Sequence, residues 1–154
     1  MWWRCWQNSP GVNHVQSVRL QKEDFSVDEE LAALRAPYPR MGGIATFIGC
    51  ARNFSAGHDV ERIEFEAYPS MAIKVLAALR EEAILQFTLF EARIVHRIGM
   101  VGAGEQIVFI ATGAEHRAPA LHACEWLIDE LKQRAPIWKK EINLEGETWV
   151  TPHP

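Results

Sequence analysis

The chain has 154 residues, of which 48% are hydrophobic and 23% charged, and its formal net charge is −4 at pH 7. This length and composition predict one domain that buries a real hydrophobic core. The acidic balance argues against a general nucleic-acid-binding protein, because contacts to phosphate need a surplus of basic residues, so any cationic site must be local.

The predicted elements mix strands and helices along the chain. Residues 1–13 are interpreted as an N-terminal extension and residues 14–154 as the folded domain. Within the domain the patterns predict strand 15–20, helix 27–36, strand 43–50, polar loop 52–59, strand 63–67, helix 69–87, strands 93–98 and 106–111 joined by the turn region 99–104, a helix from about 119 to 135, and a short strand 149–150. This order, with its short links, favours an α+β fold over a doubly wound parallel sheet.

Two of these elements have a clear inward face. In strand 63–67 apolar residues alternate with Glu64 and Glu66, which is the pattern of a strand with one face in water. The helix that begins at Pro69 is expected to point the following residues inward: Met71, Val75, Ala78, Leu79 and Ala83.

The predicted helix 119–135 is the most informative segment. Its apolar residues recur at spacings of three and four and form one stripe: Leu121, Cys124, Leu127, Ile128, Leu131 and Ala135. Pro119 suits a first helical turn, and Pro136 should end the helix. At ~100° per residue, Lys132 lies about 40° from Ile128, at the edge of the stripe. A lysine there either presents its ammonium at the rim of a cleft or is an ordinary surface lysine whose stem covers apolar surface.

Cations gather at both ends of this helix. His116 and Arg117 lie at its start, where backbone N–H groups favour an anion. Lys139 and Lys140 follow its end, in what is interpreted as a loop. Arg52, in the polar loop after strand 43–50, is a further candidate because a guanidinium can clamp phosphate oxygens, although a solvated loop arginine has the same pattern. These positions suggest an anionic substrate.

The other polar residues have simpler interpretations. His122 and Cys124 are zinc ligands by residue type, but two residues apart on a helix they point ~200° away from each other and cannot share a metal. No metal or cofactor is therefore expected. His96, in a predicted strand, is expected to be packed or hydrogen-bonded rather than catalytic. Phe47 and Trp138 fit the lining of a pocket and the packing of a core equally well.

The cellular compartment follows from the cysteines and from what the chain lacks. No apolar run approaches the ~20 residues that cross a bilayer, and the first residues lack the apolar stretch of a signal peptide. Cys5, Cys50 and Cys124 are odd in number and widely spaced, without a CxxC pair, which indicates a reducing compartment and no disulfide framework. A cytoplasmic protein without membrane association is expected.

Six motifs follow one another along the chain: Gly49-Cys50-Ala51-Arg52-Asn53, Glu66-Ala67-Tyr68-Pro69-x-Met71, Ile94-Val95-His96-Arg97-Ile98-Gly99, Gly104-Glu105, Glu115-His116-Arg117 and Leu131-Lys132-x-Arg134-Ala135-Pro136-x-Trp138-Lys139-Lys140-Glu141. In this order they resemble the catalytic large subunit family of molybdopterin synthase. The resemblance covers about residues 15–150, and its last block is quite specific.

The resemblance implies a fold, a reaction and partners. The fold would be of the α/β hammerhead type, a single domain with a mixed, largely antiparallel sheet packed with helices. The reaction would be a sulfur transfer in molybdenum cofactor biosynthesis, which converts cyclic pyranopterin monophosphate into molybdopterin. The sulfur would come from the C-terminal thiocarboxylate of a small ubiquitin-like subunit, and a homodimer of this chain would stand at the centre of a heterotetramer.

The resemblance also implies roles for the cations. Lys132 and Lys139 would be catalytic, with Lys132 acting as acid–base catalyst or stabilising charge on the thiocarboxylate carbonyl. Arg52, His116, Arg117 and Lys140 would bind substrate, although Lys140 also fits a solvated neighbour of Lys139. The cysteines need no catalytic part, because the sulfur arrives on the partner.

Helix geometry adds an expectation about assembly. Arg117 and Lys132 are 15 residues apart, which is roughly 22 Å along a helix. One phosphate cannot comfortably contact both in one chain, so His116 and Arg117 are expected to serve the site built around Lys132 of the other protomer.

Some features depart from the family pattern. Cys50 stands where relatives often carry a polar or basic residue, and the chain ends at Pro154, earlier than many relatives. An alternative function is a non-catalytic adaptor that binds a ubiquitin-like tail or an anionic ligand. The presence of Arg52, Lys132 and Lys139 together favours the enzyme.

Overall fold

The computed structural model describes residues 16–55 and 57–150. Within these ranges three helices and ten strands follow in the order β1 Val18–Gln21, α1 Val27–Arg35, β2 Gly43–Cys50, β3 Phe54–Ser55, β4 His58–Asp59, β5 Arg62–Ala67, α2 Pro69–Phe87, β6 Glu91–Arg97, β7 Gly99–Gly102, β8 Gln106–Ala114, α3 Arg117–Arg134, β9 Ile137–Asn143 and β10 Gly146–Val150. The described residues thus form the α+β fold predicted from the sequence, without a repeated βαβ pattern.

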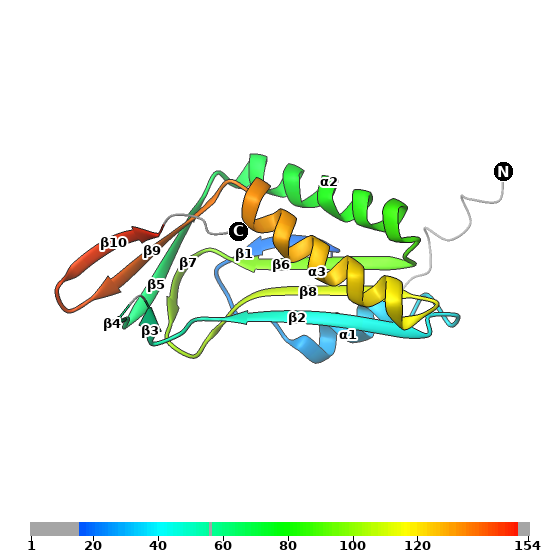
Figure 1. Cartoon of the computed structure of the whole chain (residues 1–154), viewed down its shortest axis with the longest axis horizontal. Coiled ribbons are helices and arrows are strands. Elements are labelled where there is room, and N and C mark those ends of the chain that lie inside the picture. The colour runs from blue at the N-terminus through cyan, green and yellow to red at the C-terminus, as the bar shows by residue number, and fades with distance from the viewer. Residues whose placement is uncertain (1–15, 56, 151–154) are drawn as a thin grey trace.

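The strands form two four-stranded sheets and a small hairpin (Figure 1). The first sheet has the order β1-β6-β8-β2, in which only β1 and β6 are parallel. The second has the order β10-β9-β5-β7 and is antiparallel throughout. The predicted sheet is therefore mixed and largely antiparallel, as expected, but it is divided into two.

Helices cover both faces of the first sheet. Helices α2 and α3 pack together on one face, and α1 lies on the other (Figure 1). The larger core lies under α2 and α3 and includes Leu79, Ile94, Ile110 and Leu127, all fully buried. A smaller core lies under α1, around Phe109. Because β6 and β8 are covered on both sides, their residues are buried almost continuously rather than alternately.

Local sequence explains where the helices begin and end. Ser26 caps α1, since its hydroxyl accepts a hydrogen bond from the backbone N–H of Glu29. Pro69 occupies the first turn of α2, and Thr88 ends that helix in the left-handed conformation. α3 ends before Pro136, as predicted.

Most predicted elements are confirmed, and the bounds of β2 and α2 match the prediction residue for residue. Three features were not predicted. The polar loop contains the hairpin β3–β4, the turn region after β6 contains β7, and the segment after α3, interpreted as a loop, is the seven-residue strand β9. The proposed extension 1–13 lies outside the described residues.

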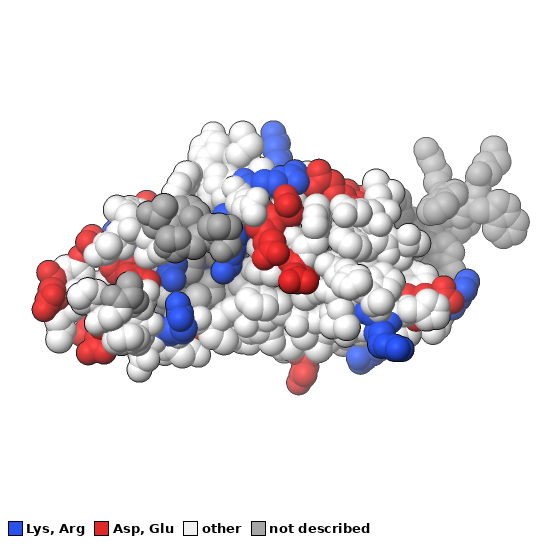
Figure 2. Space-filling model, in the orientation of Figure 1, with Lys and Arg blue, Asp and Glu red and all other residues white. Residues whose placement is uncertain are grey.

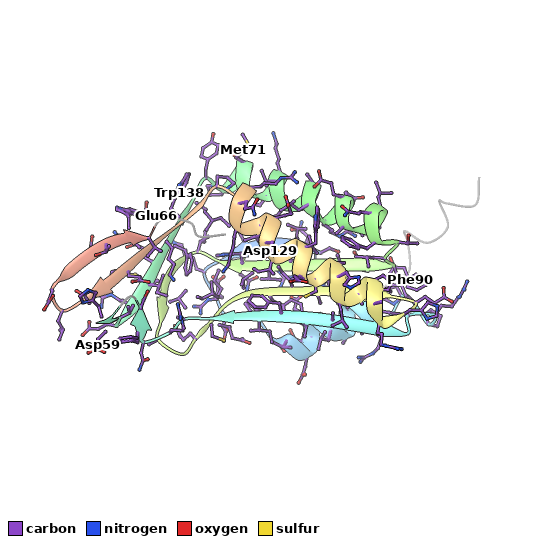
Figure 3. The ribbon with its side chains drawn as sticks, viewed as in Figure 1. Asp59, Glu66, Met71, Phe90, Asp129 and Trp138 are labelled. Carbon is purple, nitrogen blue, oxygen red and sulfur yellow. The ribbon has the colours of Figure 1, made fainter. Side chains whose placement is uncertain are left out.

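The inward faces of two helices were predicted only in part. Leu79 and Ala83 of α2 are buried as expected, but Met71 is 48% exposed and Ala78 is also exposed. Figure 3 shows Met71 on the outside at the start of the helix. Leu121 of α3 is likewise 59% exposed, because α3 turns Ala120 and Ala123 toward the sheet instead. None of the described helices is long and apolar enough to span a membrane.

Candidate active site

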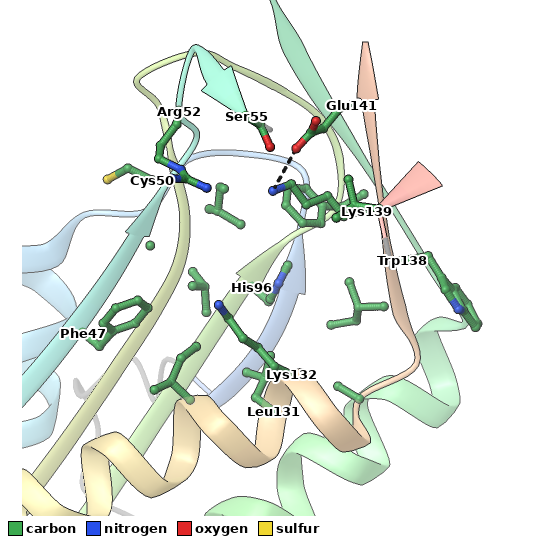
Figure 4. A pocket seen from close by; sticks show the side chains of 18 of the residues that line it. Phe47, Cys50, Arg52, Ser55, His96, Leu131, Lys132, Trp138, Lys139 and Glu141 are labelled. Atoms are coloured by element: carbon green, nitrogen blue, oxygen red, sulfur yellow. Dashed lines mark ion pairs between the residues drawn. The ribbon is translucent and has the colours of Figure 1, made fainter. Parts of the chain in front are cut away.

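A cavity of about 850 Å³ opens where the two sheets meet beside the end of α3 (Figure 4). Its walls come from the end of β2 and the loop after it, from the last turns of α3, and from β9 and β10. The lining residues include Phe47, Cys50, Arg52, Ser55, Phe65, His96, Ile107, Val108, Ile128, Leu131, Lys132, Ile137, Trp138, Lys139, Glu141, Thr148, Trp149 and Val150. Three cations and one carboxylate thus share a largely apolar cavity.

Arg52 reaches the cavity from the loop between β2 and β3. The backbone just before it is fixed, because the N–H of Ala51 donates to the carbonyl of Glu105 (2.9 Å) and the carbonyl of Ala51 accepts from the N–H of Gly104 (2.7 Å). The Arg52 side chain is exposed and forms no ion pair with any described residue. Its guanidinium is free to hold an anion.

Lys132 reaches the same cavity from the last turn of α3. Its neighbours Ile128 and Leu131 also line the cavity, which confirms that Lys132 lies at the edge of the apolar stripe of the helix. No carboxylate in the described part of the chain pairs with its ammonium. In Figure 4 the Lys132 side chain points from the helix into the cavity.

Lys139 enters from the opposite wall, on β9. It faces Phe65 on β5 and Val150 on β10, and both of these residues also line the cavity. Glu141, two residues further on the same face of the strand, forms an ion pair with Lys139 at 3.5 Å (Figure 4). This pairing leaves Arg52 and Lys132 as the unpaired cations among the described lining residues.

Lys140 lies on the other face of β9, because side chains alternate along a strand. Its ammonium pairs with Glu64 (3.2 Å) and Glu147 (3.3 Å) and lies 5.2 Å from the centre of the Trp149 ring. The hydrogen bond to Glu64 and the nearby Glu147 raise the pKa of Lys140 above its usual value. The structure does not bring Lys140 into the cavity of this chain.

His116 and Arg117 lie at the far end of α3. His116 is the N-cap and Arg117 the first helical residue, and both are exposed. The start of α3 packs against Gly43, where β2 begins, whereas the cavity lies where β2 ends. Neither side chain has a partner in the described part of the chain. Within one protomer these two residues are therefore separate from Lys132.

His96 is part of the cavity wall, a role that the sequence did not indicate. Its ring nitrogen Nδ1 lies 2.6 Å from the carbonyl oxygen of Arg97, and its ring meets the Phe65 ring edge-on. The residue is packed and hydrogen-bonded, as expected. Burial lowers the pKa of His96 to about 4, so its imidazole is neutral at physiological pH. Phe47 lines the cavity. Trp138 belongs to the cavity wall, but its side chain lies on the same face of β9 as Lys140, points away from the cavity in Figure 4 and is 49% exposed.

The described cysteines differ in their access to the cavity. Cys124 lies on the buried face of α3, and burial raises the pKa of its thiol to about 11, so it stays protonated and unreactive. Cys50 is exposed and lies on the cavity wall two residues before Arg52.

The charge distribution restricts what the cavity can bind. On the face shown in Figure 2, Lys and Arg side chains form small groups among Asp and Glu, and no broad basic surface is visible. Within the cavity three cations face one carboxylate, and apolar walls lower the dielectric constant around them. The arrangement suits a compact anion that also offers a flat apolar surface to the aromatic walls.

In comparisons with known proteins, the chain is similar to MoaE proteins and to molybdopterin synthases. The family model described as "MoaE protein" matches residues 20–134. The chain is 41% identical to the molybdopterin synthase catalytic subunit of Ralstonia nicotianae, over 88% of this chain and 77% of that protein. It is also 41% identical to that of Pyrococcus abyssi, over 91% and 93%. The crystal structure of molybdopterin synthase from Staphylococcus aureus superposes with a TM-score of 0.84 at 31% identity, covering 90% of this chain and 99% of that one.

Proposed function

Because the chain belongs to the MoaE protein family, we propose that it is the catalytic subunit of a molybdopterin synthase and acts as a sulfurtransferase. Its substrate is cyclic pyranopterin monophosphate, and the sulfur donor is the C-terminal thiocarboxylate of a small ubiquitin-like subunit. The observation that carries the proposal is the meeting of Arg52, Lys132 and Lys139 in one cavity, although they come from three different elements: the loop after β2, α3 and β9.

The three cations have different roles in this proposal. Arg52, on an anchored loop and without an ion pair among the described residues, holds phosphate oxygens of the substrate. Lys132 and Lys139 face the reacting atoms from opposite walls of the cavity. An ammonium beside the thiocarboxylate carbonyl stabilises the negative charge that develops on its oxygen, and Lys132 is placed to exchange a proton with the reacting groups.

The form of the cavity supports a tail-shaped sulfur donor. The cavity is open to solvent at the junction of the two sheets and has apolar walls on several sides. An extended C-terminal segment can place its terminal thiocarboxylate among the three cations while the body of the partner stays outside. The terminal group carries the sulfur itself, so the transfer needs neither the buried Cys124 nor the exposed Cys50 as a carrier.

His116 and Arg117 complete the site across a dimer in this proposal. They are exposed, have no partner among the described residues, and stand roughly 22 Å from Lys132 along α3. A two-fold dimer repeats every contact twice, so the start of α3 in one protomer can serve the cavity of its partner, and the reverse. Lys140 is left out of the site because Glu64 and Glu147 occupy its ammonium.

A sulfur-labelling experiment tests the function directly. The purified protein is mixed with cyclic pyranopterin monophosphate and a small subunit whose thiocarboxylate carries 35S. We expect the label to appear in molybdopterin, and no product when the small subunit ends in an ordinary carboxylate. A stable complex with the small subunit that transfers no label would identify the chain as a non-catalytic adaptor instead.

A further inference from the structure

The cavity contains one buried polar side chain that the proposed roles leave unused. His96, on β6, is 5% exposed, whereas the charged residues that line the cavity are all more accessible. Among the described residues that line the cavity, it is the one polar residue that is buried. In Figure 4 its ring lies at the back of the cavity, between the walls that carry Lys132 and Lys139.

The hydrogen bond of His96 fixes its tautomer. A backbone carbonyl only accepts hydrogen bonds, so the Nδ1 atom that lies 2.6 Å from the Arg97 oxygen must carry the hydrogen. The other nitrogen, Nε2, then holds a lone pair and acts as an acceptor. The edge-on contact with Phe65, at 5.2 Å between ring centres, limits rotation of the imidazole. No described residue donates a hydrogen bond to Nε2.

This neutral acceptor differs from the charged groups of the cavity. Arg52, Lys132 and Lys139 only donate hydrogen bonds, and the carboxylate of Glu141 is paired with Lys139. Burial keeps the imidazole neutral, so it adds no positive charge to those of the three cations. A ligand held by its anionic group on the cations would therefore meet, deeper in the cavity, a neutral acceptor without a partner among the described residues.

We propose that Nε2 of His96 accepts a hydrogen bond from an N–H or O–H group of the bound substrate and thereby sets the orientation of its ring system. The inference rests on the proposed function, whose substrate carries a phosphate and a nitrogen-rich heterocycle with such donors. The cations hold the charged end, and His96 distinguishes a heterocycle that offers a donor from one that offers only acceptors.

If His96 had a purely structural role, Asn, which keeps a donor near Nδ1, would replace it better than Gln. The pairing of β6 with β8 ends at His96, and the Nδ1 bond then serves only to satisfy the carbonyl of Arg97. Two substitutions separate the roles. His96→Asn keeps a donor near the position of Nδ1 but removes the acceptor, whereas His96→Gln places an amide oxygen near the position of Nε2 and removes the Nδ1 donor.

Steady-state kinetics of molybdopterin formation tests the proposal, with the thiocarboxylated small subunit saturating and the pterin substrate varied. We expect His96→Asn to raise KM for the pterin about tenfold or more, as for the loss of a hydrogen bond in a buried site. His96→Gln should stay within about threefold of wild type. Equal KM values for all three proteins, or rescue by Asn rather than Gln, would overturn the proposal.

A second readout needs no variant and no turnover. In 15N NMR of histidine-labelled wild-type protein, the Nε2 signal of His96 should have the shift of an unprotonated ring nitrogen. It should move toward the hydrogen-bonded range when cyclic pyranopterin monophosphate is added. A protonated Nε2, or a signal unchanged at saturation, would refute the role of His96. A wild-type protein that binds the pterin with this change but makes no product would refute the proposed function alone.

Discussion

Adjacent lysines on β9 have opposite surroundings, and this is the clearest contrast at the scale of single residues. Lys139 faces the cavity with Phe65 and Val150, and Lys140 faces Glu64, Glu147 and the Trp149 ring. Strand geometry alone produces the difference, because neighbouring side chains point to opposite faces. Chemical similarity and adjacency therefore do not give these lysines the same function.

Substitution of the two lysines should separate them. We expect Lys139→Ala to lower kcat/KM for molybdopterin formation about a hundredfold, because a positive group at the reacting centre is lost. Lys140→Ala should leave kcat/KM within about threefold of wild type, since its ammonium is held by carboxylates outside the cavity. Parallel kinetic measurements on both variants check this, and equal losses would show that Lys140 also acts in the site.

The neutral state of His96 should appear in the pH dependence of stability. Its pKa is near 6.5 in the unfolded chain and about 4 in the folded one, so between these values the unfolded state binds the extra proton. The free energy of unfolding should fall as the pH drops from about 6.5 to about 4, by about 3 kcal/mol from this residue. Denaturant unfolding of wild type and His96→Gln across this range measures the effect. If the free energies of unfolding of wild type and His96→Gln changed with pH by the same amount, this prediction would be contradicted.

At the scale of elements, the packing of α3 on the first sheet holds Lys132 in place. Leu127 of α3 is fully buried, whereas Leu85 on α2 is 80% exposed. We expect Leu127→Ala to lower the free energy of unfolding by about 2–5 kcal/mol, because it leaves a cavity. Leu85→Ala, the matched control, should change it by no more than about 0.5 kcal/mol. Equal effects in chemical denaturation would mean that α3 does not pack as described.

Elements with strong local signals could be predicted from the sequence, and β9 could not. Strand β2 is bounded by glycine and is β-rich, and α2 begins at proline, so their limits were found correctly. Strand β9 follows Pro136 and contains Lys139, Lys140 and Glu141, a composition typical of a loop. It becomes a strand because β5 and β10 pair with it on both sides, which is a tertiary effect.

The candidate site was predictable to a similar degree. The motifs identified Arg52, Lys132 and Lys139, and the structure brings these three together. Helix periodicity placed Lys132 at the edge of an apolar stripe, and helix length separated it from Arg117. The sequence could not show that Lys140 points away from the cavity, because this follows from the strand β9, which was interpreted as a loop. The cavity role of His96 depends on the packing of β6 against Phe65, for which local sequence carries no signal.

At the scale of the whole molecule, the proposal requires two protomers for each complete site. Lys132→Ala and Arg117→Ala homodimers should each be nearly inactive, because one element of every site is missing. Mixing and re-forming the dimers should restore about a quarter of the wild-type activity, since half of the random dimers then carry one intact site. Activity assays on the re-formed mixture check this, and tagged, purified mixed dimers should have about half of the wild-type activity. Mixed dimers without activity would place both residues in the site of one protomer.

The central claim is that this chain performs sulfur transfer with Lys132 at the reacting centre. Its most direct test is the single-turnover rate of molybdopterin formation from a thiocarboxylated small subunit, for wild type, Lys132→Ala and Lys74→Ala. Lys74 is an exposed residue of α2 without an ion pair among the described residues and serves as the control. We predict a loss of about a hundredfold or more for Lys132→Ala with the small-subunit complex intact, and an unchanged rate for Lys74→Ala. A wild-type rate in Lys132→Ala would contradict the account.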